Sequence, residues 1–239
     1  MKKKFVNPLI VLAAGLIIVG ASSVGATRAA MTYSNEAEQV DFSTSNLAVD
    51  IQEKQDDKYQ SVAEGALTFP AIASDMNLGS FKIGKTYPEE VQVVNTSTGN
   101  YAEYVRVMVR RSWTDEKGTK DTVLDPSLIK LGTSEGWLED KADATTEEQA
   151  FYLAKPLKKG ESAQFLETIT IDNQVVTYVK TVDGDVAGTV VNEYKYDGKR
   201  FFVELRVDAV QTHNASEAIL GAWGVKASLD SNGNIISIN

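Results

Sequence analysis

Apolar and polar side chains alternate along several stretches of this chain, and the longest such stretch is residues 200–211, RFFVELRVDAVQ. Every second residue from Phe201 to Ala209 is apolar, and the residues between them are largely polar. A period of two is that of a β-strand with one face in a core and the other in water. The same pattern predicts further strands at residues 101–113, 47–51, 91–93, 169–171, 175–179 and 235–238.

Turn signals separate these predicted strands. Residues 95–100 are a polar loop, residues 158–161 turn the chain into the next strand, and Asp183-Gly184 and Asp197-Gly198 are dipeptides of the hairpin type. Many short strands at this spacing predict an all-β fold, a jelly-roll or Ig-like antiparallel β-sandwich with short helical insertions. A parallel α/β fold would need helical patterns of roughly 10–15 residues between its strands, and the sequence shows none.

Two segments are predicted to be helical. The first is residues 142–150, which are acidic and polar and belong to a predicted surface insertion at about 132–150. The second begins with a capping box formed by Asn214 and Glu217, and Gly224 stops it.

The N-terminus has the order of a secretory signal peptide. Lys2 to Lys4 give it a basic start, and Leu9 to Val19 is an apolar run relieved by one glycine. Small residues and Thr27-Arg28-Ala29 follow, which predicts that a signal peptidase cleaves between Ala29 and Ala30. The apolar run is shorter than the roughly 20 residues of a membrane-spanning helix. The alternative is a retained membrane anchor, because the chain carries no charge from Phe5 to Thr27.

Cleavage predicts a secreted protein with no stable membrane span, in the extracellular matrix or at the cell surface. Residues 1–29 are then the signal peptide, and residues 30–239 are a single β-sandwich domain that starts with an extended segment at 30–45. The signal peptide holds four of the 24 Lys and Arg residues and none of the 33 Asp and Glu, so the rest of the chain has a net charge of −13. Because such a charge repels nucleic acid and anionic lipid, no nucleic-acid partner is predicted.

The chain has no cysteine and a single histidine, His213. Disulfides, thiol catalysis and cysteine-based metal sites are therefore excluded. Zinc sites usually draw on His and Cys, so we predict neither an enzyme nor a tightly bound cofactor. Calcium takes oxygen ligands, and weak calcium binding stays open at three acidic loops, although solvated acids are the interpretation that we favour. These loops are Asp56-Asp57, Asp183 with Asp185, and Asp230 with Asn232 and Asn234.

Two stretches match enzyme motifs letter for letter. Gly79 to Thr86, GSFKIGKT, fits a phosphate-binding loop, and Gly132 to Gly136, GTSEG, fits a nucleophile elbow with His213 downstream. The phosphate-binding loop needs a buried strand before it and a helix after it, and the elbow needs a strand-to-helix turn in an α/β sheet. The surrounding sequence predicts instead a strand at residues 81–83, a turn at Gly84-Lys85 and another strand, so we interpret both matches as parts of a β protein.

The N-terminus resembles that of the TasA and camelysin proteins. In that family, a basic signal with a threonine and alanines at its cleavage site precedes the pattern A-x-F-x-x-G-x-L-x-L. Lys2 to Lys4 and Thr27 to Ala30 match the signal, and Ser45-Asn46 stands in place of the glycine. The positions that fit the pattern are Val40, Phe42, Leu47 and Val49.

Two later stretches extend this resemblance. Residues 84–95 are similar to the family's turn, strand and asparagine, and residues 204–223 are similar to its last core strand and the exit from it. The whole resemblance spans residues 1–55, 79–113 and 200–224.

The resemblance implies a secreted jelly-roll or Ig-like sandwich. TasA-like members polymerise into biofilm-matrix fibres by donating an N-terminal strand to the next subunit, and camelysin-like members carry a metallopeptidase label. The resemblance places the donor segment between Ala30 and Val40, where the apolar residues are Met31, Tyr33 and Val40.

These observations favour a secreted structural protein, a biofilm-matrix or cell-surface fibre subunit that associates with itself or with other matrix proteins. Two alternatives stay open. One is a metal-dependent endopeptidase of the camelysin kind. The other is a non-enzymatic module that binds a surface glycan or protein through exposed aromatic residues such as Trp137 and Tyr152.

Overall fold

The structure, a computed structural model, describes residues 47–62, 65–183 and 190–239. The side chain of Asp183 is outside this description. Also outside it lie the signal peptide, the predicted cleavage site and the predicted donor residues, namely Ala29, Ala30, Met31, Tyr33 and Val40.

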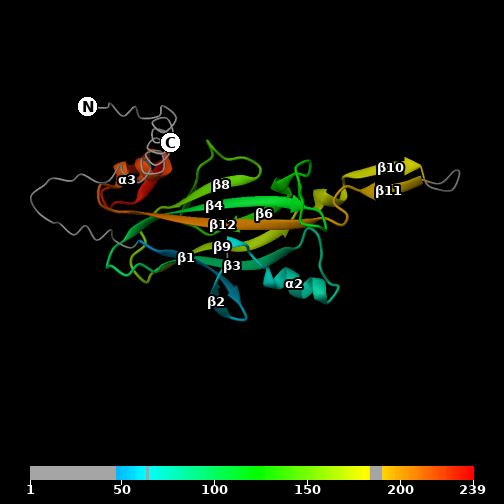
Figure 1. Cartoon of the computed structure of the whole chain (residues 1–239), viewed down its shortest axis with the longest axis horizontal. Helices are drawn as coiled ribbons and strands as arrows, with labels where there is room; N and C mark the ends of the chain where they lie inside the picture. The colour runs from blue at the N-terminus through cyan, green and yellow to red at the C-terminus, as the bar shows by residue number, and fades with distance from the viewer. Residues whose placement is uncertain (1–46, 63–64, 184–189) are drawn as a thin grey trace, which may run out of the picture. The chain divides into compact units, whose positions relative to one another are not determined.

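Two antiparallel sheets pack face to face (Figure 1). The β1 sheet has the strand order β2 (Lys58–Ser61), β1 (Val49–Gln55), β3 (Thr86–Asn95), β9 (Ser162–Ile171) and β6 (Ile129–Thr133). The β12 sheet has the order β12 (Arg200–Gln211), β4 (Glu103–Thr114), β8 (Glu148–Leu153) and β7 (Trp137–Glu139), and β5 (Lys120–Asp121) also pairs with β4. The predicted all-β sandwich is confirmed.

The main core lies between the two sheets because each strand turns alternate side chains inward. Val91, Val107 and Ile129 are fully buried there, and Leu205 is 3% exposed. Phe165 is also fully buried, with its ring 4.8 Å from the Trp137 ring and 5.5 Å from the Phe151 ring in edge-to-face contacts.

A second apolar cluster covers part of the outer face of the β12 sheet. Here α3 (Ala215–Trp223) and the hairpin of β13 (Ala227–Leu229) and β14 (Ile235–Ile238) pack on that face. The remaining elements are α2 (Pro70–Asn77), the 3₁₀ turns η3 (Pro126–Leu128) and η4 (Asn173–Val176), and a two-stranded ribbon of β10 (Val179–Asp183) and β11 (Val190–Tyr194). Figure 1 shows this ribbon, the arm, extending beyond the end of the two sheets.

Most of the predicted strands are confirmed, and three local predictions are wrong. Residues 142–150 are not helical, because Glu148–Leu153 pairs with β4 as β8, and the predicted insertion at 132–150 therefore contains sheet strands. The predicted strand at 175–179 is instead mostly the η4 turn, which begins where the Asp172 side chain accepts a hydrogen bond from Gln174 N at 2.8 Å. Residues 81–83 form no strand, although the turn at Gly84 is present.

The predicted helix after β12 exists as α3, but its capping box does not form. Asn214 adopts a left-handed conformation with φ of 49° and makes no side-chain cap hydrogen bond. Gly224 ends the helix as predicted, with φ of 75°, a conformation that glycine adopts without a Cβ penalty.

Replacement of Phe165 with alanine should lower the free energy of unfolding by about 3–5 kcal/mol, because it leaves a cavity in the main core. The matched control is Phe202→Ala on β12, where the ring is 43% exposed, and which should change stability by less than about 1 kcal/mol. Denaturant unfolding measures both values. Equal losses in the two variants would contradict this assignment of the core.

Candidate functional site: the free edge of β12

The last strand of the sandwich, β12, has a partner along its whole length on one side only. Its register with β4 runs from Arg200 opposite Thr114 to Gln211 opposite Glu103. On its other side, the described residues supply one bridge, Ala66 with Glu204. Residues 206–211, called the free edge below, are about 20 Å long at about 3.3 Å per residue and have no strand partner there among the described residues.

The hydrogen bond from Leu67 N to Val203 O, at 3.1 Å, shows which backbone groups point outward. Both polar groups of one strand residue point to the same side, and the side alternates from residue to residue. Val207, Ala209 and Gln211 therefore present their N–H and C=O groups to the free edge. An edge strand with such groups is a template for pairing with another strand.

Residues 65–69, called the strap below, lie along β12 just before the free edge begins. Gly65 has φ of 76°, and a Cβ atom there would lie 2.1 Å from the carbonyl oxygen of Leu205. Only glycine allows the strap this close to β12. The strap thus covers β12 as far as Leu205 and leaves the rest of the edge uncovered by the described residues.

Apolar side chains behind the free edge are incompletely covered. Val203 and Leu205, beside the strap, are 1% and 3% exposed. Further along the same inward face, Val207 and Ala209 are only half-buried. The strand β1 packs against β12, and its residue Val49 is also half-buried. A strand added at the free edge would cover this strip and gain apolar burial in addition to its backbone hydrogen bonds.

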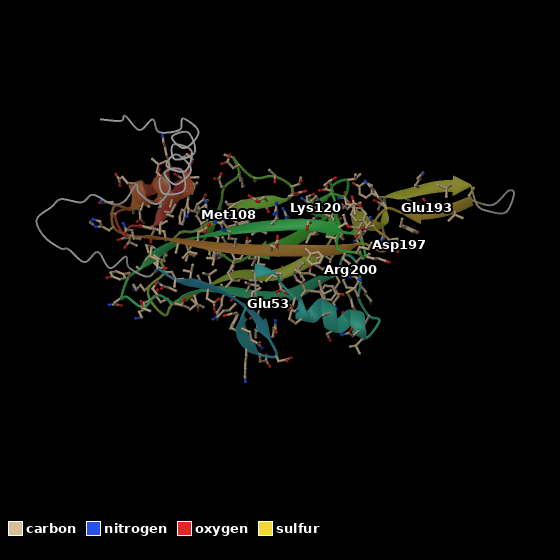
Figure 2. The ribbon with its side chains drawn as sticks, viewed as in Figure 1. Glu53, Met108, Lys120, Glu193, Asp197 and Arg200 are labelled. Carbon is tan, nitrogen blue, oxygen red and sulfur yellow. The ribbon has the colours of Figure 1, made fainter. Side chains whose placement is uncertain are left out.

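A buried carboxylate holds the strap in place. Glu53 on β1 (Figure 2) is 1% exposed. Its carboxylate accepts hydrogen bonds from Thr68 N at 2.8 Å, Thr68 Oγ1 at 2.6 Å, Phe69 N at 2.9 Å and Gln55 Nε2 at 2.9 Å. Burial opposes ionisation of Glu53, but the hydrogen bonds from Thr68, Gln55 and Phe69 outweigh it and lower the pKa of this side chain.

Glu89 on β3 lies beside Glu53, but its pKa is shifted in the opposite direction. It is 2% exposed, and no described residue donates a hydrogen bond to either of its carboxyl oxygens. Burial raises the pKa of Glu89 to about 9, together with a side-chain hydrogen bond that the protonated Glu89 donates to Glu53 and with the negative charge of Glu53. Glu89 is therefore a neutral acid at pH 7, and Glu53 is the carboxylate that carries the charge of the pair.

A second buried acid fixes the start of β1 at the far end of the free edge. Ala48 N donates to Ser97 Oγ at 2.9 Å, and Ser97 Oγ donates to the fully buried Glu103 on β4. Asn95 contributes by accepting a hydrogen bond from Ser97 N at 3.0 Å. The chain therefore enters β1 at the same end of the sandwich at which Gln211, opposite Glu103, ends β12.

The enzyme-like motifs do not form their sites. The segment 79–86 follows α2 and leads into β3, so it has neither the strand before it nor the helix after it that a phosphate-binding loop needs. Ser134 lies between β6 and β7, a strand-to-strand connection rather than an elbow. His213 is exposed between β12 and α3.

One of the acidic loops uses its carboxylate oxygens within its own turn. Asp230 accepts hydrogen bonds from Asn232 N and Asn234 N, both at 2.8 Å, and so stabilises the β13–β14 turn. Asp56 and Asp57 form the turn of the β1–β2 hairpin with φ of 48° and 64°. Asp185 lies outside the described residues. Within them, no three His, Asp or Glu side chains gather in a way that could hold a metal ion.

The aromatic residues predicted to be exposed are not. Tyr152 is 1% exposed under α3, and Trp137 is half-buried with its indole N–H donating to Gln164 O at 2.8 Å. The outer face of the β12 sheet does carry a groove of about 460 Å³ that Met108 lines in part. Arg110, Glu148, Glu204, Leu205 and Arg206 line the rest of it.

Comparison of the chain with protein-family models, with curated proteins and with solved structures found no match. The resemblance to TasA and camelysin proteins therefore stays a prediction. No helix in the described part of the chain is long and apolar enough to cross a membrane.

Replacement of Glu89 with glutamine should make stability less dependent on pH. Between pH 4.5 and about 9 the folded protein holds a proton on Glu89 that the unfolded chain releases, so stability falls as pH rises, by at most about 1.4 kcal/mol per pH unit. Glutamine removes this loss, so the variant should gain stability relative to the unchanged protein as pH rises from 5 to 9.

Thermal unfolding at several pH values measures this effect. The control is Glu90→Gln, whose carboxylate is 42% exposed and pairs with Lys54 at 2.8 Å; it should follow the unchanged protein. Parallel loss of stability in Glu89→Gln and in the unchanged protein would show that Glu89 is not the titrating group.

Proposed function

We propose that this protein is a secreted, non-enzymatic structural subunit of an extracellular matrix or cell surface, and that it assembles by adding a strand to the free edge of β12. The observation that carries the proposal is that residues 206–211 combine unpaired backbone groups with an apolar surface that is incompletely covered by the described residues. Outward-pointing backbone groups of Val207, Ala209 and Gln211 lie over an apolar strip that is only half-buried. An added strand would give the backbone groups hydrogen-bond partners and would cover the apolar strip.

The added strand is proposed to be residues 30–45 of a neighbouring copy. This segment carries Met31, Tyr33 and Val40 and directly precedes β1. The strand that follows it, β1, starts at the same end of the sandwich as Gln211. When extended, the segment would span about 50 Å at about 3.3 Å per residue. Such a segment could reach the free edge of the next subunit and make a head-to-tail contact. Because contacts of that kind repeat without closing, they build fibres.

Ala209→Pro tests this function, because it removes an N–H that points to the free edge and leaves the ladder with β4 intact. Proline is tolerated on an edge strand when its nitrogen faces away from the sheet. The secreted variant should unfold at nearly the temperature of the unchanged protein but fail to form fibres, as judged by light scattering and electron microscopy.

The matched control is Ala209→Ser, which keeps the N–H at nearly the same side-chain size and should assemble as the unchanged protein does. Deletion of residues 30–45 should also leave a folded protein that forms no fibres. The proposal is wrong if Ala209→Pro forms fibres normally, or if the unchanged secreted protein forms no fibres at high concentration.

A further inference from the structure

The arm, β10 with β11, is a two-stranded ribbon without a covering layer in the described part of the chain. Every β11 side chain is exposed, and Val190, Val191 and Tyr194 are 68%, 48% and 50% exposed. The arm stands apart from the sandwich, with Glu193 labelled on it in Figure 2. An isolated two-stranded hairpin is marginally stable in water and normally needs a third strand or a packed face.

The outer edge of β11 has the backbone geometry to accept such a strand. Lys195 N donates to Tyr178 O at 2.9 Å, so Lys195, Glu193 and Val191 direct their polar groups toward β10. Val190, Asn192 and Tyr194 therefore direct their N–H and C=O groups away from β10, where no described strand pairs with them. One of these groups has a partner among the described residues, because Tyr194 O accepts a hydrogen bond from Asp197 N at 3.1 Å.

We propose that β11 pairs with β11 of a second copy, antiparallel and centred on Asn192. This two-fold register sets Val190 opposite Tyr194 of the second copy, and Tyr194 opposite Val190 of the second copy. A β-branched residue opposite an aromatic one is a favourable cross-strand pair. Glu193 then lies opposite Val191 rather than opposite another Glu193, so the register places no like charges against each other.

The sequence of β11 is what favours a second copy as the occupant. Pairing of β10 with itself about Thr181 would set Val179 opposite Asp183, an apolar residue against an acid. The β11 register instead matches apolar with apolar at both ends and amide with amide at its centre. Each of its three pairs, at 190, 192 and 194, exchanges both backbone hydrogen bonds. Tyr194 O uses its second lone pair for this, since it already accepts from Asp197 N.

This contact is independent of the free edge of β12. Head-to-tail strand addition at β12 makes a linear fibre, whereas a two-fold contact at the arm joins two subunits and stops. The arm would therefore make dimers of the unassembled protein and cross-links between fibres.

The absence of cysteine allows a direct test by oxidative cross-linking of the secreted protein. Asn192→Cys puts the two thiols opposite each other at a separation suited to a disulfide. Thr181→Cys is the matched control on the outer edge of β10. Both variants lose the same hydrogen bond, from Thr181 Oγ1 to Asn192 Oδ1, so this loss cannot explain a difference between them.

Asn192→Cys should cross-link to a dimer at least about tenfold faster than Thr181→Cys, corresponding to a preference of about 1.4 kcal/mol for the β11 register. Adding Val190→Lys, which places a charge opposite Tyr194 of the second copy, should reduce cross-linking to the level of the control. Equal rates for the two single-cysteine variants, or no effect of Val190→Lys, would overturn the proposal.

Combining Asn192→Cys with Ala209→Pro separates the two interfaces. Cross-linking through the introduced thiol should persist in this double variant when fibre formation is lost. If the Asn192→Cys variant forms fibres but does not cross-link, the arm proposal fails and the function proposed for β12 stands. If it cross-links only in chains that form fibres, the arm is not an independent contact and the proposal fails.

Discussion

Backbone N–H and C=O groups need hydrogen-bond partners, and among the described residues β12 has a strand partner along its whole length on one side only. Its pairing with β4 runs from Arg200 to Gln211 and fixes half of its polar groups. The strap satisfies the outward carbonyl of Val203, and Gly65 closes over Leu205. What remains, residues 206–211, is an edge that a further strand can complete. The proposed function depends on this one-sided strand.

Two buried acid clusters frame that edge, and each holds a segment that limits it. Glu53 binds the strap through backbone and side-chain hydrogen bonds, and Ser97 with Glu103 holds the chain where it enters β1. Burying carboxylates costs solvation free energy, which hydrogen bonds offset for Glu53 but not for Glu89. The raised pKa of Glu89 is thus the consequence of its burial first, and then of its position beside Glu53, the anchor of the strap.

The sequence predicts the strands well wherever a period of two survives, as in β12, β4 and β1, because that period reflects local burial. The prediction fails at β8, because this strand begins with polar residues and is held in place by its pairing with β4. It also fails at η4, where a hydrogen bond to the Asp172 side chain redirects the chain. Glu53 did leave a signal, since it continues the inward series of Val49 and Ile51. The free edge left none, because the order of strands in a sheet arises from pairings between residues far apart in the chain.

Amide hydrogen exchange along β12 tests the central claim most directly. In the unassembled protein, the N–H groups of Arg206, Asp208 and Val210, which point toward β4, should exchange slowly. Those of Val207, Ala209 and Gln211 should exchange fast, and on assembly only these should become slow. Protection of Val207, Ala209 and Gln211 before assembly, or their continued fast exchange within fibres, would contradict the account.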